Sequence, residues 1–133
     1  MAREQQKDLA QKFVDAQASF DTEGMSATLA EDAKHDLLPA SLGVGQKDNA
    51  GKIEVTKKLG SALDNKPVTV KVLQSIQDVE QRKTALFIEK QYEFGPVQSF
   101  FTISFNEDNS KIIHTVEFVN GEAWKKLMTK VQG

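Results

Sequence analysis

Residues 111–120 read KIIHTVEFVN, and this segment has the pattern of a β-strand followed by a helix cap. Successive side chains of a strand point to opposite faces, so a regular strand places Ile113, Thr115 and Glu117 on one face of a sheet. The other face then carries the intervening residues, which are Ile112, His114, Val116 and Phe118. Glu117 is therefore predicted to lie on the opposite side of the sheet from His114.

Three further strands are predicted before this segment. In residues 68–72, Val alternates with polar residues, which is the periodicity of a strand. Residues 84–94 and 98–105 are longer strand candidates, and Gly95-Pro96 separates them. The Asn- and Asp-rich residues 106–110 are expected to form the turn that leads into the final strand.

The beginning of the chain is expected to be helical. Apolar residues recur there at steps of four, three and four, which places them on one face of a helix: Leu9, Phe13, Ala16 and Phe20. Asp21 and Thr22 offer capping side chains for a short second helix. That helix would carry two apolar residues four positions apart, Met25 and Leu29.

The middle and the end of the chain supply the remaining elements. Residues 33–38 form a possible short strand ended by Pro39, and residues 41–51 have the composition of a loop. A third helix is expected to place four apolar residues on one side, Ile53, Leu59, Ala62 and Leu63. Asn120-Gly121 could form a hairpin turn, but we prefer Asn120 as a helix cap because apolar residues follow at helical spacing, namely Trp124, Leu127, Met128 and Val131.

This order of elements predicts an α+β fold in which helices pack on one face of a mostly antiparallel sheet. The 133 residues suit a single domain, 1–133, and 39% of them are hydrophobic, which is enough for a sizeable core. The net charge is −2, with no basic stripe, which argues against a nucleic-acid partner.

The sequence also limits the chemistry and the compartment. Without Cys, the chain has no disulfide, no thiolate metal site and no thiol nucleophile. The first residues are polar, and no apolar run approaches the roughly 18 residues that span a bilayer, so we expect a cytoplasmic protein with no membrane partner. A Walker motif and a dinucleotide-binding fingerprint are both missing, so no cofactor is expected.

Two strings resemble the SnoaL-like branch of the nuclear transport factor 2-like superfamily. Residues 35–43 read HDLLPASLG and are similar to an H-x-x-L-P-x-S-L-G string of fungal members. Residues 111–120 resemble the family's final strand, where an acidic residue precedes two apolar residues and then Asp or Asn. The resemblance extends from about residue 9 to residue 124.

The resemblance implies a cone, in which a curved sheet wraps around the N-terminal helices and encloses an apolar cavity open at one end. Members of the family commonly form homodimers through the outer face of the sheet. The fold hosts isomerases, dehydratases, epoxide hydrolases, polyketide cyclases and proteins without catalysis. The fold therefore implies a small hydrophobic ligand but not a reaction.

Glu117 is the first catalytic candidate. It matches the position of a catalytic acid in limonene epoxide hydrolase, a relative by fold, and a carboxylate in an apolar pocket has a raised pKa. The remaining polar positions of that enzyme, an Arg and an Asp, correspond roughly to Lys90 and Tyr92, which argues against epoxide hydrolysis. The structural alternative is a Glu that hydrogen-bonds the cone together.

His35 and Tyr92 are the other catalytic candidates. His35 precedes Pro39 near the pocket of relatives, where it could relay protons, or it could simply be packed beneath the loop of residues 41–51. Tyr92 could donate a hydrogen bond to a ligand, or it could lie at a dimer contact. His114 becomes an alternative base only if a bulge changes the register of the last strand.

The predicted cavity lining consists of large apolar residues that any cone fold would need inside: Phe13, Phe20, Met25, Leu29, Phe87, Phe101 and Trp124. No metal site is expected, because two His without an acidic cluster offer too few ligands. The favoured function is a cofactor-independent isomerase, cyclase or dehydratase that moves protons on a polyketide- or terpenoid-like metabolite. The alternative is a non-catalytic module that binds a hydrophobic ligand or a partner protein.

Overall fold

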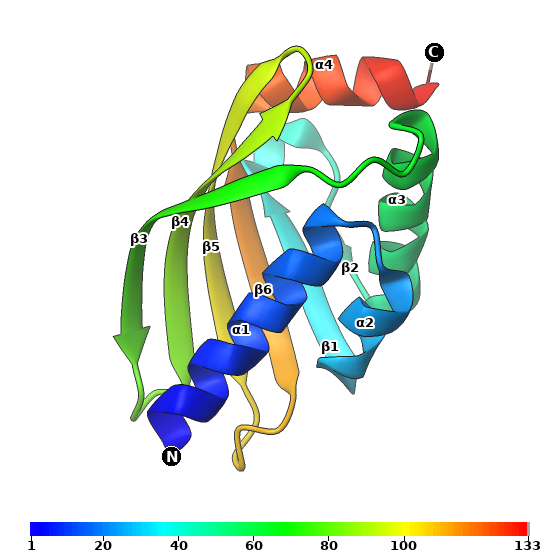
Figure 1. The fold of residues 1–133 in the computed structure, drawn as a ribbon. Coiled ribbons are helices and arrows are strands. Elements are labelled where there is room, and N and C mark those ends of the chain that lie inside the picture. Colours follow the sequence, from blue (N-terminus) through cyan, green and yellow to red (C-terminus); the bar gives the residue numbers. More distant parts are fainter. Residues whose placement is uncertain (133) are drawn as a thin grey trace.

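The chain forms a six-stranded sheet and four α-helices in the computed structural model, which describes residues 1–132 (Figure 1). The order of strands across the sheet is β2-β1-β6-β5-β4-β3. None of the helices in this part of the chain is long and apolar enough to cross a membrane. In chain order the elements are α1 (Ala2–Ala18), α2 (Thr22–Ala27), β1 (Leu29–Leu38), the 3-10 helix η1 (Ala40–Leu42), β2 (Gln46–Lys47), α3 (Asn49–Ala62), β3 (Thr69–Asp78), β4 (Lys83–Tyr92), β5 (Gly95–Phe105), β6 (Ile112–Val119) and α4 (Gly121–Gln132).

The sheet is antiparallel except at one junction. Strands β3 to β6 pair in sequence order as antiparallel neighbours, as the run of strands in the second half of the chain predicts. β1 enters from the N-terminal half and pairs in parallel with the last strand, β6, while β2 extends the other edge of β1. The predicted α+β fold with a mostly antiparallel sheet is confirmed.

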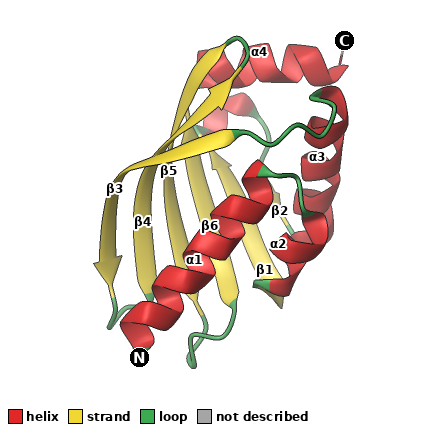
Figure 2. Ribbon diagram, in the orientation of Figure 1, coloured by secondary structure: helices red, strands yellow, loops and turns green. Residues whose placement is uncertain are grey.

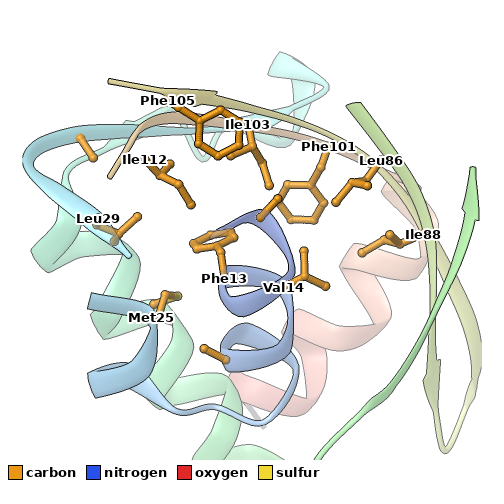
Figure 3. Close-up of a cluster of buried hydrophobic side chains, with 13 residues drawn as sticks. Phe13, Val14, Met25, Leu29, Leu86, Ile88, Phe101, Ile103, Phe105 and Ile112 are labelled. Atoms are coloured by element: carbon orange, nitrogen blue, oxygen red, sulfur yellow. The ribbon is translucent and has the colours of Figure 1, made fainter. Parts of the chain in front are cut away.

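The helices cover the concave face of the sheet (Figure 2). α1 lies across this face, α2 and α3 flank it beside β1, and α4 crosses one end of the cone. Figure 3 shows Phe13 of α1 pointing into a cluster of strand side chains, where its ring meets the edge of Phe101 at a centroid distance of 6.3 Å. This cluster is the hydrophobic core, and its largest members besides these two are Met25, Leu29, Ile88, Ile103, Phe105 and Ile112.

Side-chain caps explain where α2, α3 and α4 begin. Asp21 accepts a hydrogen bond from the backbone N–H of Gly24, and Asp48 accepts one from Gly51, each at 2.9 Å. Asn120 accepts from two backbone N–H groups of α4, which confirms its predicted role as a helix cap. The predicted loop over residues 41–51 is partly wrong, because the cap at Asp48 starts α3 at Asn49.

Two boundaries in the N-terminal half also differ from the prediction. Leu29 does not belong to the second helix, because α2 ends at Ala27 and Leu29 begins β1. β1 is accordingly longer than the short strand expected over residues 33–38. The backbone N–H of Ile112 donates to the carbonyl of Thr28 at 2.8 Å, so pairing with the last strand starts directly at the end of α2.

The predicted faces of β6 are wrong at one end. Phe105 pairs with Ile112, but the neighbouring Ser104 pairs with His114, so one extra residue is inserted into β6 at Ile113. This bulge turns Ile112 into the core and leaves Ile113 39% exposed, whereas a regular strand would do the reverse. Thr115 and Glu117 lie beyond the bulge and are both buried, as expected for an inward face.

We expect Phe13→Ala to lower the free energy of unfolding by about 3–5 kcal/mol, because it removes a fully buried ring from the centre of the core. Urea denaturation followed by circular dichroism measures this loss. Ile76→Thr is the control, since Ile76 is 57% exposed on the edge strand and should change the free energy by no more than about 0.5 kcal/mol. Equal losses in the two variants would contradict this description of the core.

Candidate functional site

A cavity of about 350 Å³ lies between the concave face of the sheet, α3 and α4. The apolar part of its wall comes from all three elements, with Val55, Leu59, Val97, Val119, Leu127 and Met128 as examples. On α3 the lining residues Lys52, Val55, Thr56 and Leu59 have the spacing of one helix face. The interior of the cone is therefore not packed solid, and there is room for a small organic molecule.

Glu117 and Lys90 form a buried ion pair in the wall of this cavity. They project inward from β6 and β4, on either side of β5, and Lys90 Nζ donates to Glu117 Oε2 at 3.0 Å. Their side chains are only 8% and 11% exposed. Lys90 Nζ also lies 5.5 Å from the centroid of the Phe101 ring, a favourable position for a cation over an aromatic face.

The ion pair reverses the expected titration of Glu117. Burial by itself would raise the pKa of this carboxyl, but the ammonium groups of Lys90 and Lys52 outweigh burial and bring the net shift below the ordinary value. The Ser99 hydroxyl adds to this lowering, although it makes no regular hydrogen bond. The prediction of a lone acid with a raised pKa is therefore wrong, and Glu117 is ionised.

Lys52 and Tyr92 complete the polar part of the wall. Lys52 projects from the first turns of α3, and burial together with the charge of Lys90 lowers its pKa, although Glu117 opposes the shift. Burial raises the pKa of Tyr92, so its hydroxyl is protonated and can donate. Tyr92 also stacks on Phe94 at 5.4 Å. Both side chains line the cavity.

His35 lines the same cavity, but both of its ring nitrogens have partners. Asn49 Nδ2 donates to the backbone carbonyls of Ala30 and Glu31, so Asn49 Oδ1 faces His35 Nε2 at 2.9 Å. That oxygen can only accept, which places the imidazole proton on Nε2. His35 Nδ1 then accepts from the Thr115 hydroxyl at 2.7 Å. Burial lowers the pKa of His35 and keeps it neutral.

His114 lies outside the cavity. It occupies the outer face of β6, where its Nε2 meets Asp36 Oδ2 at 2.6 Å, and Gln46 Nε2 donates to the same carboxylate. The bulge at Ile113 precedes His114, so the alternation from His114 to Glu117 stays regular and keeps the two side chains on opposite faces. The alternative in which His114 reaches the pocket is therefore corrected.

Only two of the seven residues expected to line the cavity do so. Phe20 and Trp124 are part of its wall. Phe13, Met25, Leu29 and Phe101 instead belong to the packed core, where α1 and α2 meet the sheet. Phe87 lies on the outer face, where its ring contacts Phe100 at 6.3 Å. Four of the seven residues therefore fill the core, and aliphatic residues of the sheet, α3 and α4 form much of the cavity wall in their place.

Two polar residues of the site were not among the catalytic candidates. Lys90 was considered only as the counterpart of a polar position in limonene epoxide hydrolase, and its pairing with Glu117 was not predicted, because pairing across two strands depends on their register. Lys52 could have been found from the helical spacing of Lys52, Val55, Thr56 and Leu59. Among the described residues, no group of three His, Cys, Asp or Glu could hold a metal ion.

Solved structures share this arrangement along nearly the whole chain. The pinacolase BvnE from Penicillium brevicompactum matches with a TM-score of 0.84 and 19% identity, over 98% of this chain and 96% of its own. PrhC from Penicillium brasilianum matches with a TM-score of 0.83 and 18% identity, over 99% and 91%. A candidate SnoaL-like polyketide cyclase from Shewanella putrefaciens has a TM-score of 0.74 and 9% identity, over 94% and 86%.

At these identities the likeness shows the fold alone. No protein-family model matches the sequence, and no curated protein sequence matches it either. The chain has the SnoaL-like fold of the nuclear transport factor 2-like type, as the resemblance in residues 35–43 and 111–120 implied.

We expect Lys90→Met to lower the free energy of unfolding by about 3–5 kcal/mol at neutral pH, because it leaves Glu117 buried without its partner. The pH dependence should also change sign. In the native protein the pKa of Glu117 is lowered from its ordinary value of 4.5, so its ionisation stabilises the fold at pH values above 4.5. This contribution is lost as the pH falls and the carboxylate is protonated. In the variant a raised pKa should instead make stability fall as the pH rises above about 4.5.

Denaturant titrations over a range of pH measure both effects. The double variant Lys90→Met/Glu117→Gln should recover most of the loss, since neither remaining side chain is charged. The matched control is Lys58→Met, which breaks the exposed Glu54–Lys58 pair (3.1 Å) and should cost less than about 1 kcal/mol. A Lys90→Met variant as stable as the control would contradict the buried ion pair.

Proposed function

We propose that this chain is a cofactor-independent enzyme of the isomerase, cyclase or dehydratase kind, acting by proton transfer on an apolar polyketide- or terpenoid-like molecule. The observation that carries the proposal is an ionised carboxylate, Glu117, in the wall of a 350 Å³ cavity beside hydrogen-bond donors. Structures of the same fold include a fungal pinacolase and a candidate polyketide cyclase, which supports an enzymatic use of the cavity.

In the proposed reaction Glu117 removes a proton from a carbon next to a carbonyl group. The electron pair of the broken C–H bond moves into a C=C bond, and the carbonyl oxygen becomes an enolate oxygen. Lys90 and Tyr92 are hydrogen-bond donors for this oxygen. Where a C=C bond is conjugated with the enolate, Glu117 returns its proton to the far carbon of that system and the double bond shifts. In a ring closure the enolate carbon attacks a carbonyl carbon of the same molecule, and the alkoxide that forms takes the proton from Glu117. In a dehydration the enolate expels a hydroxyl group from the next carbon, and this group takes the proton from Glu117 and leaves as water.

The low pKa of Glu117 does not prevent this chemistry. When the carboxylate accepts a proton, the negative charge does not disappear but moves to the enolate oxygen of the ligand. Lys90 and Lys52, whose charges lower the pKa of Glu117, then stabilise the enolate. The total charge in the buried site stays constant, so proton transfer does not leave an ammonium group unpaired in a low-dielectric environment.

The remaining candidates have different parts in the proposal. His35 would have to break a hydrogen bond to Thr115 or Asn49 before it could exchange a proton. We therefore propose that it positions β1, β6 and α3 around the cavity. Because both ring nitrogens of His35 are hydrogen-bonded, Glu117 has no free acid–base partner with a different pKa. This observation favours the alternative function, a non-catalytic binding module.

We expect the native protein to accelerate deuterium exchange at the carbons next to the carbonyl of 2-tetralone, a compact apolar ketone. Glu117→Gln should reduce the rate by about 100-fold or more, because it removes the base. NMR in D₂O measures the exchange. Tyr92→Phe should reduce the rate less, since Lys90 still donates to the enolate oxygen.

Glu54→Gln is the matched control, because Glu54 is an exposed carboxylate on α3 and should leave the rate unchanged. The native rate should stay level as the pH falls from neutrality towards 4.5, since Glu117 remains ionised there. Exchange no faster than in Glu117→Gln would favour the binding module over the enzyme.

We also propose that two copies associate through the outer face of the sheet. On this face the neighbouring strands β1, β6, β5 and β4 place apolar residues side by side in one row. The paired residues are Leu38, Phe118, Phe100 and Phe87. Phe118 and Phe100 are 53% and 41% exposed in the single chain. A row of exposed aromatic residues on the face opposite the helices is the kind of surface that a second copy would cover.

We expect the native protein to be a dimer by size-exclusion chromatography with light scattering, and Phe118→Glu to shift it to a monomer. The charge would lie in the centre of the proposed interface without a partner. Lys57→Glu, on an exposed position of α3, is the control and should remain dimeric. A monomeric native protein would exclude this interface.

A further inference from the structure

The polar groups of the cavity are mostly hydrogen-bond donors. Lys90 uses one of its three N–H groups for Glu117, and Lys52 and Tyr92 make no side-chain hydrogen bond to any residue of 1–132. Among the acceptors, Glu117 Oε2 takes a hydrogen bond from Lys90, His35 Nδ1 takes one from Thr115, and the amide of Gln17 can donate as well as accept. A ligand that satisfies this wall must bring acceptors.

The cavity also has more positively charged than negatively charged side chains. Its cations are Lys52 and Lys90, with Lys47 of β2 at the edge, whereas Glu117 is the carboxylate that points inward. Asp36 contributes to the wall, but its carboxylate pairs with His114 on the outer face. Lys90 neutralises Glu117, and among residues 1–132 no acidic side chain forms an ion pair with Lys52.

Lys52 is held in this environment by the helix that carries it. Its position on α3 is set by the cap at Asp48, and it shares the cavity-facing side of the helix with Val55 and Thr56. Desolvating an ammonium group without a partner is costly, and the lowered pKa of Lys52 reflects this cost. An anion in the cavity would remove the cost, and the site would gain stability on binding.

We propose that the natural ligand is an apolar molecule with a carboxylate group, and that this carboxylate binds the ammonium group of Lys52. The apolar body then lies against the aliphatic wall, with its reactive carbon towards Glu117. The proposal rests on the proposed function only in taking the cavity as the ligand site. It names Lys52 as the residue that selects acids over neutral molecules of equal size.

Binding of 2-naphthoate and of 2-naphthamide tests the proposal, since the two differ in charge but hardly in shape. Isothermal titration calorimetry of the native protein should show naphthoate binding about 10-fold or more tightly, as expected for a hydrogen-bonded charge pair. Lys52→Met should bring the two affinities close together, whereas Lys58→Met, on the exposed side of the same helix, should preserve the preference.

Proton uptake gives a second measurement that a merely structural role of Lys52 would not produce. A bound carboxylate raises the pKa of Lys52, so binding above neutral pH should be accompanied by proton uptake. Calorimetry in buffers of different ionisation enthalpy measures this uptake, because the observed heat then depends on the buffer. The other titratable groups facing the site are Glu117, Lys90, Tyr92, His35 and Lys47. Lys52→Met should remove the uptake if Lys52 is its source.

Three results would overturn the proposal: naphthoate that fails to bind the native protein, naphthamide that binds equally well, or a preference for naphthoate that survives Lys52→Met. None of these depends on catalysis. If deuterium exchange depends on Glu117 but acids are not preferred, the enzyme proposal stands and the carboxylate proposal is refuted. If acids are preferred but no exchange occurs, the carboxylate proposal stands and the enzyme proposal is refuted.

Discussion

The rest of the site depends on the buried ion pair between Lys90 and Glu117. Because the two side chains reach each other over β5, they can pair only if β4, β5 and β6 keep one register and present the same face to the interior. Removing two charges from water is costly, and a fold retains such a pair at the expense of stability that an apolar pair could supply. The cost is understandable if the charges are needed in the cavity. The pair then holds a carboxylate ionised in a place where burial alone would neutralise it.

The distribution of aromatic residues explains why a cavity exists at all. Phe13, Phe101 and Phe105 fill the region where α1 crosses the sheet, so that end of the cone is solid. Towards α3 and α4 the wall consists mainly of Val, Leu and Met, with Phe20, Tyr92 and Trp124 among them, and a space remains between these side chains. Core and cavity are thus neighbouring parts of one concave surface. The ionisable residues lie on the cavity side, where a ligand can replace the missing contacts.

The fold was predictable from the sequence because its elements have clear periodicities and caps. The spacing of Phe13 and Ala16, the alternation in β4 and the cap at Asn120 all appear in the structure. The periodicity of β6 predicted that Glu117 and His114 lie on opposite faces, and the resemblance to limonene epoxide hydrolase implied that Glu117 faces the cavity. The bulge at Ile113 and the pairing of Glu117 with Lys90 were not predicted, because both depend on how distant strands align. Lys52 was overlooked because Ile53, its neighbour on α3, packs against the core and suggested a different helix face.

The parallel pairing of β1 with β6 has a consequence for the way the molecule is made. β1 is complete at Leu38, but its partner in the sheet, Phe118, follows 80 positions later in the chain. During synthesis on the ribosome β1 must therefore remain unpaired along one edge until β6 has emerged. Local hairpins between β3, β4 and β5 can form earlier, since their contacts are close in sequence. The sheet should close last along the β1–β6 seam, and the protein is exposed to aggregation until it does.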